Sequence, residues 1–301
     1  MSLIRKITGL LGHEEEPSKV SPVGEKRAAL LAHVVEMTDM RIADENNYQE
    51  VLLPAIKIAR AYYEQSLDIV PGPVALDSTH FLLSRIFPDA QDIPACLGRS
   101  LAVKNELPAY EEKADSPRLY ALLGVRIKQT PENKQVFTDH TVRSLALSPI
   151  KVRQILKEAA FDSLLQSFAN ENLHYEKKLE QARAQYELRQ AVGVAAHHAE
   201  DANVMQQGKT PPLVRAYLNK SADQVLSGLR EWLYSPQHLM RISMSEGFLV
   251  QEGGKDEEEW RLPLMVTQDR RQWNVCLISF PIHMARKALK AEAHNHRFIL
   301  I

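Results

Sequence analysis

The sequence predicts a helix-rich α+β fold, and three patterns carry this prediction. Residues 161–186 repeat apolar side chains at alternating spacings of four and three, the heptad pattern of a helix that packs lengthwise on another. Two runs between residues 119 and 145 alternate apolar and polar side chains, as β-strands do. Three further runs after residue 239 are typical of an antiparallel meander. We therefore expect an N-terminal helical region with a β-hairpin, one long amphipathic helix, and a C-terminal meander with flanking helices.

The composition is that of an ordinary soluble globular protein. The chain has 301 residues, enough for about two domains, with 45% hydrophobic and 25% charged residues. A net charge of -1 provides no global field that would attract nucleic acid. No apolar run reaches the length of about 18 residues that a transmembrane helix needs. Cys96 and Cys276 lack metal or redox spacing, so we expect reduced, buried thiols and a cytoplasmic protein.

The N-terminal segment, residues 1–20, has a separate character. Residues 1–12 place five apolar side chains on one helical face beside Arg5 and Lys6, and a polar linker follows. Such a helix can lie on an anionic membrane surface, although it is short and weakly charged. The alternatives are a helix that docks on the protein itself and a frayed terminus.

Helical patterns dominate residues 21–117. Ser21-Pro22 is typical of a helix start, and a helix to about residue 42 is followed by a second over 48–68 that contains Pro54. We expect Asp77 to cap a short helix over 81–87, another short helix after Pro94, and a loop over 107–117. The β-hairpin then spans residues 119–145, and the sequence leaves open whether it joins the C-terminal sheet.

The long helix is predicted over residues 149–192, between Ser148-Pro149 and a break at Gly193. Asn172 stands at an a-type heptad position, where a buried amide can set register and partner number. The predicted interaction seam consists of Phe161, Leu165, Phe168, Asn172, Tyr175, Leu179, Ala182 and Tyr186.

Charges beside the seam favour one orientation of a paired helix. In a parallel, in-register pair, Glu171 would face the partner's Glu176. Lys178 would likewise face the partner's Arg183, so both contacts would join like charges and repel. We therefore expect antiparallel packing, either on helices of the same chain or on a second copy. An ordinary amphipathic helix in a helical domain is the competing interpretation.

The C-terminal part, residues 207–301, is predicted to be a separate α+β domain after a helical domain over 21–206. Ser221-Ala222-Asp223-Gln224 has the form of a helix capping box. Strands are expected over 239–251, 259–267 and 272–280, and the third is apolar on both faces, which is typical of a central strand. A helix from Pro281 and a last strand over 298–301 complete this part.

Histidines are the candidates for chemistry, and none makes a convincing site. Asp139 and His140 are neighbours on a predicted strand, so their side chains point to opposite faces. His80 follows the expected cap Asp77, and the pair formed by His197 and Asp201 offers fewer ligands than a zinc site needs. Nucleotide-binding glycine motifs and nucleophile elbows are absent. We assign no catalytic residue, metal or cofactor.

The resulting functional prediction is a non-catalytic interaction or scaffold protein that acts through helix-helix contacts of the long helix. Its partner is another protein or a second copy of itself, in antiparallel arrangement, and not nucleic acid. One alternative is an enzyme with an unrecognised site built from His80, His140 or the His197 cluster. The other is a protein that touches the membrane surface through residues 1–12.

Overall fold

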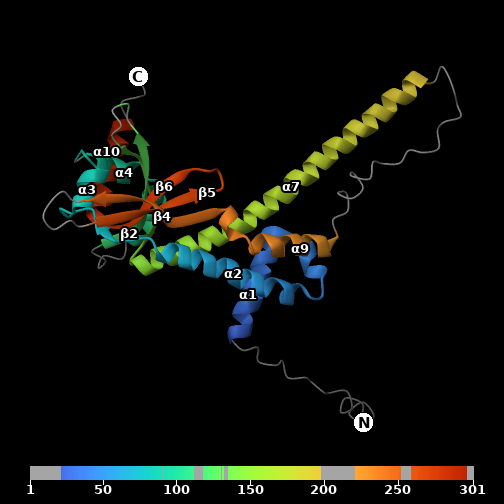
Figure 1. Ribbon diagram of the computed structural model, residues 1–301, viewed down its shortest axis with the longest axis horizontal. Helices are drawn as coiled ribbons and strands as arrows, with labels where there is room; N and C mark the ends of the chain where they lie inside the picture. The colour runs from blue at the N-terminus through green and yellow to red at the C-terminus, as the bar shows by residue number, and fades with distance from the viewer. Residues whose placement is uncertain are drawn as a thin grey trace, which may run out of the picture.

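The computed structural model describes residues 22–89, 91–111, 118–129, 131, 135–197, 221–251 and 259–296, and it describes the side chains of the long helix as far as Asn172, together with Ala184. The α+β class is confirmed (Figure 1). The helices are α1 (Pro22–Thr38), η2 (Met40–Asp44), α2 (Tyr48–Asp68), α3 (Phe81–Ile86), α4 (Asp92–Arg99), α5 (Leu101–Glu106), α6 (Pro108–Glu111), α7 (Pro149–His197), α9 (Ala222–Leu233), η3 (Pro236–His238) and α10 (Ile282–His296). The strands are β1 (Val74–Ala75), β2 (Arg118–Gln129), β3 (Gln135–Ala146), β4 (Met240–Gln251), β5 (Glu259–Thr267) and β6 (Gln272–Pro281).

The described strands form one sheet in the order β3-β2-β6-β5-β4, with β1 added in parallel to the end of β6. The hairpin β2-β3 therefore joins the C-terminal strands, because β2 pairs with β6 over residues 118–125 and 274–281. β6 is central and buried on both faces, as its apolar pattern predicts. The sheet therefore contains strands from both sides of the predicted domain boundary between residues 206 and 207. The division of the chain into domains stays a prediction.

The β4-β5 hairpin bends away from β6 halfway along its length. β5 pairs with β6 only over residues 264–266, and Pro263, which has no N–H to donate, directly precedes this ladder. On β4, a bulge between Ser243 and Phe248 contains Gly247. The bend folds the distal half of the hairpin over the sheet, so that Leu262 becomes fully buried in the core on that face.

The two faces of the sheet are covered by different helices. One face packs against α3, α4, α5 and α10, where Cys96, Phe280 and Ala288 belong to the same buried cluster. The other face packs against the C-terminal end of α2 and the first turns of α7, through residues such as Leu67 and Val152. The sheet is thus sandwiched, and α2 and α7 are the helices that lead away from it (Figure 1).

Beyond the sheet, α2 and α7 meet α1 and α9 in a separate helical core. Tyr63 of α2, Phe161 of α7 and Leu229 of α9 are each at most 1% exposed there. The indole N–H of Trp232 donates to the carbonyl of Leu164 at 3.1 Å and so fastens α9 to α7. At its N-terminus, α9 carries the predicted capping box, in which Ser221 and the third helical residue bond reciprocally.

Three local predictions are wrong. Asp77 does not cap α3, since the imidazole Nδ1 of His80 accepts the Leu82 N–H at 3.2 Å instead, and Asp77 pairs with Arg118. The expected loop over 107–117 contains the helix α6. The long helix continues through Gly193 to His197, because an internal glycine weakens a helix by about 1 kcal/mol without ending it. The predicted features over residues 1–20 and 298–301 lie outside the described residues.

Candidate functional site

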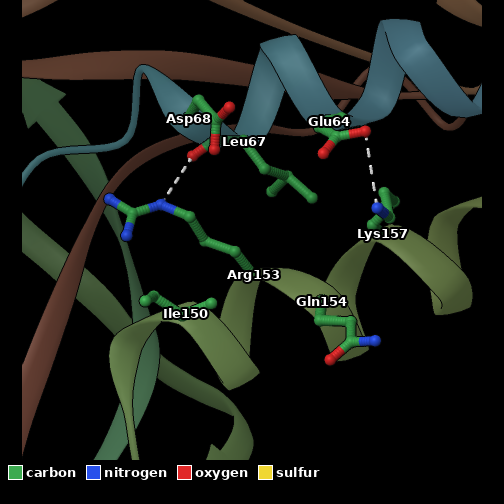
Figure 2. A pocket seen from close by; sticks show the side chains of 7 residues that line it. All are labelled: Glu64, Leu67, Asp68, Ile150, Arg153, Gln154 and Lys157. Atoms are coloured by element: carbon green, nitrogen blue, oxygen red, sulfur yellow. Dashed lines mark hydrogen bonds and ion pairs between the residues drawn. The ribbon is translucent and has the colours of Figure 1, made fainter.

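A cavity of about 280 Å³ lies between the C-terminal end of α2 and the N-terminal end of α7 (Figure 2). Leu67 forms its apolar floor and is 2% exposed. Four charged side chains, one amide and the largely exposed Ile150 complete the wall. The lining residues are Glu64, Leu67, Asp68, Ile150, Arg153, Gln154 and Lys157.

The cations of this cavity are engaged with α2. Arg153 donates through Nε to the carbonyl of Leu67 at 3.2 Å and through Nη2 to that of Val70 at 2.8 Å. The Leu67 carbonyl belongs to the last turn of α2 and that of Val70 lies just beyond the helix, where the helix dipole favours positive charge. Lys157 lies 3.5 Å from the carboxylate of Glu64 (Figure 2). Arg153, Lys157 and Glu64 therefore take part in the helix-helix contact, and no histidine, serine or cysteine lines the cavity.

The same contact continues along both helices as a ladder of opposite charges. Glu158 of α7 pairs with Arg60 of α2, whose guanidinium also lies over the Phe161 ring at 5.5 Å from its centroid. Further along, Asp162 accepts from His33 of α1 at 2.8 Å. Positions on α7 rise while positions on α2 fall, so the proximal half of α7 packs antiparallel to α2 within the chain.

The structure separates the predicted seam into two parts. Phe161, Leu165 and Phe168 are 1%, 0% and 7% exposed and belong to the helical core with α1, α2 and α9. They are therefore not available to another molecule. Asn172 is half-buried at the end of this contact. The remaining seam positions, Tyr175, Leu179, Ala182 and Tyr186, follow on α7 outside the described side chains.

The distal half of α7 extends away from the other described helices and strands (Figure 1). After Phe168, the last seam residue in the core, the helix continues to His197. At 1.5 Å per residue this is about 40 Å of helix. Its backbone is thus presented outward over the part of the sequence where the heptad pattern continues.

Two of the histidines considered for chemistry hold the short helix α3. His80 caps its N-terminus and packs edge-on against Trp260, with ring centroids 4.9 Å apart. His140 donates through Nε2 to the carbonyl of Ile86 at 2.7 Å, at the C-terminal end of α3. Both imidazoles bond to backbone groups rather than to a carboxylate. They do not form the convergent site that the enzyme alternative requires.

The structure also places the remaining candidates for chemistry, which are Asp139, the two cysteines and His197. Asp139 lies within the register shift on β3, between the pairs Gly124–Thr141 and Arg126–Thr138, and it forms an ion pair with Arg126 at 3.2 Å. Cys96 and Cys276 are buried, and burial raises the pKa of each thiol to about 12, so neither is a reactive thiolate. His197 ends α7, and the rest of its cluster lies outside the described residues. Within the described part of the chain, no group of three or more metal-ligating side chains gathers.

Sequence reasoning missed the charged ladder between α2 and α7. Its signal was present as Arg60 and Glu64 on one predicted helix and Lys157 and Glu158 on another. Only the three-dimensional structure identifies α2 as the partner of α7, because charges at these spacings on α7 could pair with any helix that carries opposite charges.

None of the described helices has a stretch both long and apolar enough to cross a bilayer. Comparisons of the chain with protein-family models, curated proteins and solved structures gave no match.

Proposed function

We propose that this protein is a non-catalytic interaction or scaffold protein and that its docking element is residues 172–192, within the distal half of α7. The observation that carries the proposal is the outward course of this half-helix (Figure 1). Its sequence continues the heptad repeat beyond the point at which the chain's own core ends. A helix that repeats apolar positions at this spacing is stabilised by burying them against another helix.

The proximal half of the helix has a different role. Its apolar positions pack inside the chain, and its charges bond to α1 and α2. This anchors α7 between the sheet and the helical core, so the distal half is held in a defined direction. The anchored half therefore supports the scaffold role without itself binding a partner.

A cytoplasmic location and peripheral contact with a membrane through residues 1–12 stay predictions. For the enzyme alternative, His80 and His140 bond to the backbone at opposite ends of α3, and the His197 cluster lies outside the described side chains. We therefore keep the interaction role as the leading function.

The test is site-specific photocrosslinking in cells that express the full chain. A benzophenone amino acid replaces Leu179, a heptad position of the distal half, and in a matched control it replaces Ala184. Ala184 is exposed and stands at an f-type position, away from the seam. We expect a crosslinked product of higher mass from position 179 and little from position 184.

Absence of any intermolecular product from position 179 would overturn the proposal. Equal crosslinking yields from both positions would also count against the proposal, because a helix that pairs with another helix contacts it through one face only. Circular dichroism of both variants checks that the photoreactive side chain leaves the helical content unchanged.

A further inference from the structure

We infer that the occupant of the distal half of α7 is the same segment of a second copy, in antiparallel orientation. This inference rests on the proposed function and names its partner. A closed two-fold pair presents the same surface twice, so each favourable contact occurs twice.

Charge complementarity selects this arrangement. In an antiparallel pair the e positions of one helix face the e positions of the other. Glu176 and Arg183 both occupy e positions. With Leu179 level with the partner's Ala182, each Glu176 position stands opposite an Arg183 position, and symmetry repeats this pairing of opposite charges. The parallel, in-register pair instead places Glu171 opposite Glu176.

The same register also places seam positions of compatible size and polarity level with one another. Tyr175 stands level with the partner's Tyr186, and Leu179 with Ala182, which combines a large with a small position in the central layers. Asn172 stands level with the partner's Arg189, so polar positions close the apolar span at both ends. This span begins after Phe168, whose ring packs against Trp232 of α9.

The course of α7 suits such a pair. The sheet and the helical core of each copy lie along the proximal half of its helix (Figure 1). An antiparallel arrangement therefore places the two bodies at opposite ends of the paired segment, whereas a parallel one places them side by side. The proximal half already pairs antiparallel with α2 through opposite charges.

The experiment is sedimentation analysis of the purified full chain over a concentration series, with a charge-reversal cycle. Glu176→Arg places two like-charged pairs in the antiparallel dimer, and we expect association to weaken about tenfold. Arg183→Glu should do the same, and the double variant E176R/R183E should restore wild-type association. A parallel dimer would respond oppositely to Glu176→Arg, because the new arginine would face Glu171.

Disulfide trapping reports the orientation directly. Mixed E176C and R183C variants should form a heterodisulfide, whereas mixed K178C and R183C variants should not. The native thiols leave a low background because both are buried and their pKa values are raised. A chain that sediments as a monomer up to about 100 µM, or trapping of only the parallel pair, would overturn the inference.

The outcomes separate this inference from the proposed function. If position 179 crosslinks to a product that is not twice the mass of the chain, α7 docks a different protein. The second-copy assignment then fails while the interaction role stands. If the purified chain is monomeric and position 179 gives no product, both fail.

Discussion

An ion pair between Asp77 and Arg118 ties the segment after β1 to the start of β2. Arg118 donates to both carboxylate oxygens and extends Nη2 toward the carbonyl of Ser279 at 3.4 Å. Its hydrogen bond and positive charge hold the pKa of Asp77 below the ordinary value, against a smaller opposing effect of desolvation. A single residue thus joins three segments that are distant in sequence.

Replacing Asp77 by Asn tests this tie through its dependence on pH. A carboxylate whose pKa is lower in the folded state adds stability above its unfolded pKa of about 4, and this contribution disappears as pH falls through the folded value. Asp77→Asn should therefore destabilise the chain at pH 7 by up to about 1 kcal/mol, a value limited by solvent screening. The gap to wild type should shrink near pH 3. Urea unfolding at the two pH values measures it, and a gap that grows on acidification would contradict the assignment.

At the scale of elements, the bent β4-β5 hairpin closes the core over one face of the sheet. Gly247 is required where the two strands approach, because a Cβ there would lie 2.5 Å from the carbonyl oxygen of Leu262. This atom belongs to the backbone and cannot move aside as a flexible side chain would. The bend in turn buries Leu262 and brings Phe248 against Phe137 of β3, with ring centroids 5.4 Å apart.

Gly247→Ala should destabilise the protein by about 2 kcal/mol, because the added methyl group forces the bend open. Gly228→Ala is the matched control, since its Cβ would meet only the Phe168 ring, at 3.8 Å. In the helix α9 this change should be neutral or stabilising by up to about 1 kcal/mol. Thermal unfolding of the two variants provides the comparison, and equal effects would show that the close approach does not constrain the bend.

At the scale of the whole molecule, α2 and α7 join the sheet to the helical core. Both helices contribute to the cluster on the sheet face and to the cluster with α1 and α9. Their antiparallel packing is fastened by Lys157 with Glu64 and by Glu158 with Arg60. The first half of α7 is therefore part of the folded body, and the second half extends from it (Figure 1).

Phe161→Ala tests whether the proximal seam belongs to the body. The side chain is 1% exposed, so its truncation should reduce the free energy of unfolding by about 3 to 5 kcal/mol. Ile150→Ala, at a position 77% exposed on the same helix, should change it by less than about 0.5 kcal/mol. Denaturant titration at low protein concentration measures both. A small effect at Phe161 would mean that the proximal seam is a docking surface after all.

The local elements were largely determined by the sequence itself. The periods of α2, β2, β3 and β6, the capping box at Ser221 and the central character of β6 depend on neighbours along the chain. Hydrogen bonds within a helix or across a tight hairpin form over short separations, so composition and spacing suffice to predict them. The heptad repeat likewise indicated that the long helix packs against other helices.

Only the tertiary structure decided which of these elements meet. The hairpin β2-β3 pairs with β6, which lies more than a hundred residues further along the chain, and α7 packs on α2. Asp77 forms an ion pair with Arg118, and His80 caps the N-terminus of α3 in its place. Such contacts depend on the total area buried and on how several surfaces fit at once, which no local pattern encodes. For the same reason, the heptad repeat could not show by itself that the first half of α7 is buried in the helical core while the second half extends outward.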